Sequence, residues 1–175
     1  CALPICGLKA TINCGGVCGG IRHDSAPRGA KAVRWGDASM NDILRRLRAA
    51  YQAWHESKGK SIETWLALVA EEIDFRSLAD GAAGAPWSKR RRTREEVRHY
   101  LTGLTAEFEM IHFTVDRFVS EDDTVVMVGS TAWTCKRTGR KVYTPKVDVW
   151  RFKNGLAVEF SEYFDTARLA DAARS

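Results

Sequence analysis

Long apolar runs are missing from this sequence. No stretch approaches the roughly 20 consecutive apolar residues that a membrane-spanning helix needs, because charged residues interrupt every apolar segment within a few positions. We therefore predict no membrane partner. Composition also excludes disordered and fibrous proteins, since 45% of the 175 residues are hydrophobic and six are tryptophan. The length favours a single domain with one core.

Cysteine is scarce after the first 18 residues, and Cys135 is the only cysteine in that later part of the sequence. This excludes a disulfide framework for most of the chain, and we predict a reduced, cytoplasmic protein. Cys14 and Cys18 have no second ligand pair at zinc spacing, and the histidines are dispersed. A glycine-rich phosphate loop and a nucleophile elbow are also missing. We predict no metal and no cofactor.

Positive charge is in small excess and is unevenly distributed. The formal net charge is +5, and residues 1–39 carry +3 of it. A nucleic-acid-binding protein usually shows a basic stripe interleaved with aromatic residues. Only SKRRRTR at 88–94 comes close to this pattern. We interpret it as a solvated loop, with an anion-attracting loop at a pocket mouth as the alternative, and we predict no nucleic-acid partner.

Residues 1–39 differ from the rest of the chain. They are rich in Gly, Pro and Ser, begin with Cys, and show no sustained apolar period of 2 or 3.6. We interpret them as an unstructured leader outside the fold. Two origins remain open, a native segment or a non-native one that precedes a native start at Met40. Residues 40–175 are predicted to form one domain.

The first half of that domain shows the apolar spacing of helices. Ile43, Leu47 and Tyr51 recur on one helical face. A capping box formed by Thr93 and Glu96 is typical of a helix start. The predicted elements are a helix over 42–58, a shorter helix capped by Ser61 with Val69 on its buried side, a strand within 71–81, and a helix over 93–106.

The second half has a period of two, which is typical of strands. The joins SEDD, KRTGRK and KNG are short, so consecutive strands are expected to form an antiparallel meander. Its apolar face needs a cover, which the three helices supply. We predict an α+β domain. The expected strands span 107–119, 124–136, 141–153 and 156–165.

Two carboxylates share strand faces with aromatic residues. Alternation places Asp148 on the face of Trp150, and Glu162 on the face of Phe160. Burial disfavours a charged carboxylate, so we expect raised pKa values and proton transfer near neutral pH. The alternative is a structural role for these residues in ion pairs. Asp148 would pair with Lys146 or with an arginine of a neighbouring strand, and Glu162 would form an ion pair at the sheet rim.

The order of elements, together with DFRSLADG, TPKVDVWRF and AVEFSEYFD, resembles the SnoaL-like and ketosteroid-isomerase-like proteins of the nuclear-transport-factor fold. The resemblance covers about residues 40–173. It implies a strongly curved, mostly antiparallel sheet wrapped as a cone around three helices, with a hydrophobic pocket at the open end. It also implies a homodimer.

The same resemblance implies catalytic roles. Tyr51 matches the oxyanion-hole tyrosine of the isomerase, and Asp148 matches its protonated aspartic acid. Glu162 matches the acid/base aspartate of SnoaL-type polyketide cyclases. Ser77 stands at the position of the isomerase's general base, and a serine hydroxyl does not take up a proton at ordinary pH.

Two functions follow as hypotheses. The first is a cofactor-free enzyme that acts on a hydrophobic, carbonyl-containing small molecule by proton transfer, as an isomerase, cyclase or dehydratase. Tyr51 and Asp148 would polarise an oxygen, and Glu162 would move the proton. The alternative, favoured by Ser77, is a non-catalytic module for small-molecule binding or dimerisation. The predicted substrate-binding residues are Trp54, Phe75, Ser77, Trp87, His112, Trp133, Trp150, Phe160 and Phe164.

Overall fold

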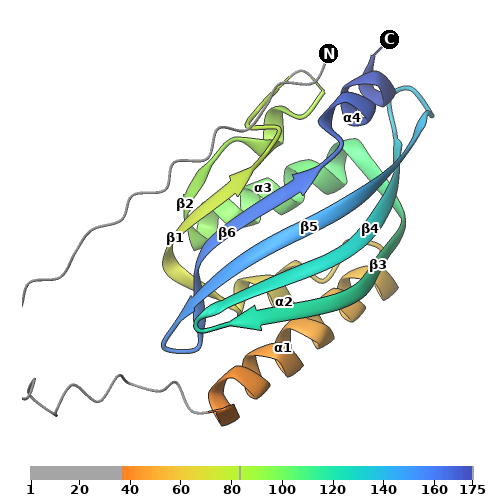
Figure 1. Ribbon diagram of the computed structural model, residues 1–175. Helices are drawn as coiled ribbons and strands as arrows, with labels where there is room; N and C mark the ends of the chain where they lie inside the picture. Colours follow the sequence, from red (N-terminus) through yellow and green to blue (C-terminus); the bar gives the residue numbers. More distant parts are fainter. Residues whose placement is uncertain (1–36, 83, 175) are drawn as a thin grey trace, which may run out of the picture. The chain divides into compact units, whose positions relative to one another are not determined.

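The structure is a computed structural model that describes residues 37–82 and 84–174 (Figure 1). Of the predicted leader, residues 1–36 lie outside the described residues. Residues 37–39 belong to the first helix. The helices are α1 Asp37–Glu56, α2 Ile62–Leu66, α3 Arg94–Glu107 and α4 Thr166–Ala173, with a short 3-10 turn at Pro86–Ser88.

Six strands form one mixed sheet in the order β2-β1-β6-β5-β4-β3. Only the pairing of β1 with β6 is parallel, and the other neighbours are antiparallel. The predicted meander and the mostly antiparallel, strongly curved sheet are confirmed (Figure 1). The strands are β1 Val69–Ser77, β2 Arg91–Thr93, β3 Phe108–Glu121, β4 Thr124–Cys135, β5 Lys141–Lys153 and β6 Leu156–Phe164.

Several boundaries differ from the sequence prediction. Val69 begins β1 and does not extend the second helix. The described residues contain four α-helices, one more than predicted, because the chain turns into α4 directly after β6. The side chain of Asp165 caps this helix by accepting a hydrogen bond from the Arg168 amide at 3.0 Å.

Helices α1, α2 and α3 cover one face of the sheet, and the core lies between the two layers (Figure 1). The predicted capping box fixes the start of α3: Thr93 accepts from the Glu96 amide, and the Glu96 side chain accepts from the Thr93 amide. The largest fully buried side chains come from both layers and include Leu47, Tyr100, Phe108 and Met127.

The basic segment at 88–94 is not a simple solvated loop, because Arg91–Thr93 forms β2 at the sheet edge. Asp74 on β1 forms ion pairs with two arginines of this segment. Arg90 Nε lies 2.6 Å from Asp74 Oδ1, and Arg92 Nη1 lies 3.8 Å from the same oxygen. Arg76 also binds Asp74, and hydrogen bonds from Arg76 and Arg90 hold the pKa of Asp74 well below its usual range. The cations of this edge are therefore partly neutralised.

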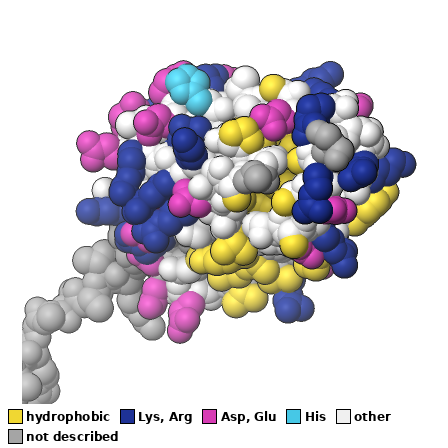
Figure 2. Space-filling model, turned by 90° about the horizontal axis from the view of Figure 1, so that it is seen from above, with side chains coloured by type: hydrophobic (Ala, Val, Ile, Leu, Met, Phe, Trp, Pro, Cys, Tyr) yellow, Lys and Arg dark blue, Asp and Glu magenta, His cyan; other side chains and the backbone are white. Residues whose placement is uncertain are grey.

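At the end of the molecule that carries α4, positive and negative side chains are interspersed, with apolar side chains between them (Figure 2). The face seen there has no large area of a single sign. Within the described ranges, none of the helices has the length and apolar character needed to cross a membrane.

Candidate functional site

A cavity of about 80 Å³ lies between the helices and the sheet, and its wall is mainly aromatic. Each of the four α-helices contributes at least one side chain to it, including Leu169 of α4. Ten of the twelve predicted site residues line this cavity. They are Tyr51, Trp54, Phe75, Trp87, Trp133, Asp148, Trp150, Phe160, Glu162 and Phe164.

Strand β5 supplies most of the polar wall. Its burial alternates strictly from Val142 to Phe152, as a strand covered on one face requires. Lys146 and Asp148 are therefore buried on the face of Trp150. In the pairing of β5 with β6, Asp148 lies opposite Glu162. This register brings two carboxylates together from neighbouring strands.

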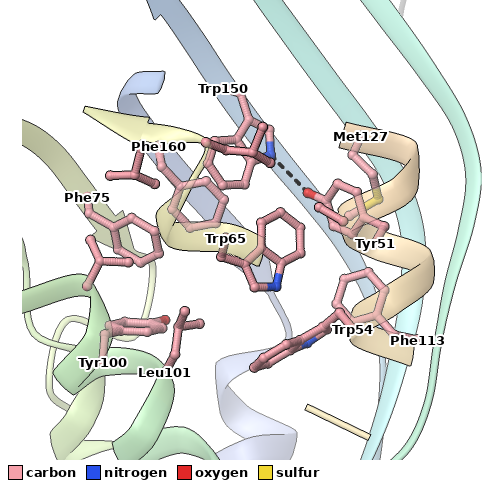
Figure 3. Packing of buried hydrophobic residues seen from close by; sticks show 14 of the residues in the cluster. Tyr51, Trp54, Trp65, Phe75, Tyr100, Leu101, Phe113, Met127, Trp150 and Phe160 are labelled. Atoms are coloured by element: carbon pink, nitrogen blue, oxygen red, sulfur yellow. Dashed lines mark hydrogen bonds between the residues drawn. The ribbon is translucent and has the colours of Figure 1, made fainter. Parts of the chain in front are cut away.

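Tyr51 connects α1 to this polar wall. Its hydroxyl donates to Asp148 Oδ2 at 2.7 Å. It accepts from Trp150 Nε1 at 2.9 Å, as Figure 3 shows. All three side chains are buried. Tyr51 therefore has a fixed hydroxyl orientation, with its donor aimed at the carboxylate.

Lys146 lies between the two carboxylates. Its Nζ donates a hydrogen bond to Glu162 Oε2, and it lies 3.0 Å from Asp148 Oδ1. The ammonium is aligned with Glu162, so Asp148 Oδ1 has an ion-pair contact but no aligned hydrogen bond. The Tyr100 hydroxyl of α3 donates to Glu162 Oε1. Each carboxylate thus binds one tyrosine, and both contact one lysine.

Burial and charge together set the protonation of this cluster. Burial raises the pKa of Asp148, because it outweighs the stabilising charge of Lys146, and Glu162 raises it further. Burial would lower the pKa of Lys146, but the charges of Asp148 and Glu162 raise it above its usual value. Burial, reinforced by the adjacent carboxylates, also raises the pKa values of Tyr51 and Tyr100.

Two predicted site residues do not line the cavity. Ser77 is buried next to it, opposite Glu162 in the pairing of β1 with β6, and hydrogen-bonds to Tyr100. His112 lies on the other face of β3, with its ring centroid 6.2 Å from that of Tyr143. His112 does not line the cavity, because a β-bulge between Met110 and His112 shifts the alternation by one residue.

The same bulge places Phe113 in the cavity wall, where strict alternation predicts His112. The Phe113 amide donates to His55 Nδ1 at 3.1 Å, so α1 supplies an acceptor where the β-ladder is interrupted. Another bulge, in β6, buries Ala157, which strict alternation from Phe160 would place on the opposite face. Alternation within one strand does not reveal these shifts.

Lys146 and Tyr100 were not predicted as site residues. A signal was present for each: Lys146 shares the face of Asp148, and Tyr100 lies on the apolar face of the helix at 93–106. Their contact with Glu162 depends on how α3 and β5 pack against β6. Trp65 of α2 was likewise predicted only as a buried residue, and it lines the cavity. Among the described residues, no three His, Cys, Asp or Glu side chains lie close enough to hold a metal ion.

The fold has relatives among known proteins. The profile of the SnoaL-like domain matches residues 47–160, and the chain belongs to this family. Comparison with curated proteins gives no match.

Solved structures share the fold. One is a protein of unknown function from Burkholderia pseudomallei that is described as similar to nuclear transport factor 2. It is 24% identical in sequence, the match covers 77% of this chain and 98% of that protein, and the TM-score is 0.68. A proposed SnoaL-like polyketide cyclase from Mesorhizobium loti is 17% identical, with a TM-score of 0.58 over 69% and 97%. A ketosteroid-isomerase-like protein from Catenulispora acidiphila, solved with trimethylamine, is 16% identical, with a TM-score of 0.60 over 73% and 91%.

Proposed function

We propose that this protein is a small enzyme that binds a hydrophobic, carbonyl-containing molecule and transfers a proton without a cofactor. The observation that carries the proposal is the gathering of Tyr51, Tyr100, Lys146, Asp148 and Glu162 in the wall of an otherwise largely apolar cavity. Water is largely excluded there, so charge and hydrogen bonds act more strongly on a bound molecule than they do in solution. The solved relatives described as a polyketide cyclase and as a trimethylamine complex support a cavity of this kind.

Asp148 is the proposed acid. Burial raises its pKa, and in its neutral form a carboxylic acid donates a hydrogen bond to a carbonyl oxygen. Tyr51 holds Asp148 in place, because its single O–H is directed at Asp148 Oδ2 at 2.7 Å. Asp148 then stabilises the negative charge that develops on the oxygen.

Glu162 is the proposed base. It takes the proton from the carbon next to the carbonyl group; the C–H electron pair forms a carbon–carbon double bond, and the carbonyl π pair moves onto the oxygen as an enolate. When the substrate also has a β,γ carbon–carbon double bond, the enolate is a dienolate; returning the proton to its γ carbon gives the conjugated isomer, so atoms and electrons balance without a co-reactant. Lys146 and Tyr100 orient Glu162 through their hydrogen bonds.

Entry of a ring-sized molecule requires the cavity to expand. Its volume of about 80 Å³ is about half that of the engineered cavity of about 150 Å³ that holds benzene. Leu169 of α4 forms part of the wall, and α4 is short. We propose that α4 moves with Leu169 when a ligand enters.

The second candidate is a non-catalytic small-molecule-binding module. One observation favours it: both oxygens of Glu162 already accept hydrogen bonds, one from the Tyr100 hydroxyl and one from the Lys146 ammonium. Ser77 at the isomerase base position points the same way. The cytoplasmic location and the homodimer stay predictions, and light scattering of the purified protein tests the homodimer.

Deuterium exchange distinguishes the two candidates. The probe is 4-hydroxyacetophenone in D₂O, and proton NMR follows the loss of its methyl signal. We expect the wild type to accelerate exchange over buffer, and Glu162→Gln to lower the rate about 100-fold or more. The matched control is Glu159→Gln on the same strand, since Glu159 pairs with Arg151 outside the cavity. Probe binding without exchange would favour the binding module.

A further inference from the structure

Two indole N–H groups in the cavity wall have no hydrogen-bond partner within the described part of the chain. They belong to Trp65 and Trp87. The two side chains are only 6% and 7% exposed, so bulk water does not satisfy these groups. An indole nitrogen is only a donor. The missing partner of each group is therefore an acceptor.

Trp65 is held firmly in place. Its ring stacks on Trp150, with centroids 5.6 Å apart and planes at 3°, and meets Tyr51 edge-on at 4.8 Å. Figure 3 shows its nitrogen on the side away from the hydrogen bond between Trp150 and Tyr51, directed between Trp54 and Leu101. Both of these residues line the cavity. The free donor of Trp65 therefore faces the space where a ligand would lie.

Trp87 is fixed in a comparable way on the other side of the cluster. Its ring meets Tyr100 edge-on, with centroids 5.1 Å apart and planes at 89°. Gly103 on α3 makes this approach possible, since a Cβ there would lie 2.6 Å from Trp87 Cβ. Trp65 thus packs against the tyrosine that binds Asp148, and Trp87 packs against the one that binds Glu162.

A third tryptophan in the same wall provides the contrast. The indole N–H of Trp150 is also buried, and it donates to Tyr51 at 2.9 Å. A buried N–H without an acceptor costs free energy, and such groups in native proteins are rare. Two of them in the wall of one cavity indicate that the acceptor comes from the ligand.

We propose that Trp65 and Trp87 donate hydrogen bonds to acceptor oxygens of the ligand. The ligand is then a flat, oxygenated aromatic molecule with a carbonyl or ether oxygen at its edge, in addition to the group that meets Asp148 and Glu162. The aromatic wall suits such a ring. This inference rests on the binding half of the proposed function, and it excludes plain hydrocarbons and ligands with only donors at that edge.

A pair of probes tests the proposal. 4-Hydroxyacetophenone and 4-ethylphenol share a ring, a phenol group and nearly the same shape, but only the first has a carbonyl acceptor. We expect the wild type to bind the ketone about five- to tenfold more tightly in calorimetry. Trp65→Phe and Trp87→Phe should each reduce this ratio. Tyr143→Phe is the control, because Tyr143 is an exposed aromatic residue that does not line the cavity.

NMR of the wild type provides a test that does not depend on folding of the variants. With ¹⁵N-labelled protein, the indole protons of Trp65 and Trp87 should move downfield with the ketone more than with 4-ethylphenol. Equal shifts of the Trp65 and Trp87 indole protons with both probes, together with a preference for the ketone that survives Trp65→Phe and Trp87→Phe, would mean that water fills these positions, which overturns the inference while binding of the carbonyl group at Asp148 stands. Failure of both probes to bind overturns the ligand site itself and the proposed function with it. Selective binding without deuterium exchange overturns only the catalytic half.

Discussion

Tyr51 Oη donates to Asp148 Oδ2 at 2.7 Å across 97 positions of sequence. This bond connects the first helix to the central strand β5, and Trp150 completes it by donating to the same hydroxyl. The pair determines which atoms of the carboxyl group are available. One oxygen of Asp148 is occupied by Tyr51, and the other has no aligned donor. The second oxygen is the one that a ligand can engage.

Removing the Tyr51 hydroxyl should affect stability and protonation together. Tyr51→Phe leaves the Trp150 N–H and Asp148 Oδ2 unpaired, so we expect a loss of about 1–3 kcal/mol in the free energy of unfolding. The pKa of Asp148 should rise further, since the hydrogen bond from Tyr51 lowers it. Urea unfolding and NMR titration measure the two effects. The control is Tyr143→Phe, at an exposed tyrosine, which should change neither the free energy of unfolding nor the pKa of Asp148. If Tyr51→Phe also leaves both quantities unchanged, the hydrogen bond between Tyr51 and Asp148 contributes little.

Lys146 should be essential to the fold at neutral pH. Lys146→Met leaves two buried carboxylates without their cation, and we expect a loss of about 3–5 kcal/mol. The loss should shrink in acid, because protonation removes the uncompensated charge. Denaturant unfolding at pH 5 and pH 7 measures it. Lys141→Met on the exposed face of the same strand is the control, and equal stabilities of the two variants would contradict the role of Lys146.

Asp148 should impose a pH dependence of defined sign. Because its pKa in the folded state lies above its ordinary value of 3.8, its stabilising contribution is complete below that value and is lost as pH rises through the raised pKa. An asparagine does not titrate. The stability of Asp148→Asn relative to wild type should therefore increase as pH rises from 4 toward neutral. Urea unfolding across this range measures the difference, and a constant difference would disprove a raised pKa.

The bulge in β3 should depend on His55. The Phe113 amide has His55 Nδ1 as its acceptor, so His55→Ala leaves a partly buried N–H unpaired and should cost about 1–2 kcal/mol. His55→Asn retains a side-chain oxygen and should recover part of the loss. Thermal or urea unfolding gives the values. The control is His99→Ala, at an exposed helix position, whose free energy of unfolding should stay within about 0.5 kcal/mol of the wild-type value. If His99→Ala destabilises the protein as much as His55→Ala does, His55 has no special role at the bulge.

The sequence by itself determined the local elements and the faces of most side chains. The capping box of Thr93 and Glu96 marked the start of α3 almost to the residue, and alternation placed Asp148 and Trp150 on the buried face of β5. These features are local, because helix caps and strand periodicity depend on a few consecutive residues. Ten of the twelve predicted site residues consequently line one cavity.

Only the tertiary structure decided which side chains meet. The parallel pairing of β1 with β6 brings Ser77 opposite Glu162, and the packing of α3 brings Tyr100 to the same carboxylate. The bulge in β3 replaces His112 by Phe113 in the wall. Bulges and long-range pairings follow from the neighbouring strand and the covering helix, not from the periodicity of one segment. The partners of the two acids, and hence the chemistry open to them, were therefore fixed only by the assembled fold.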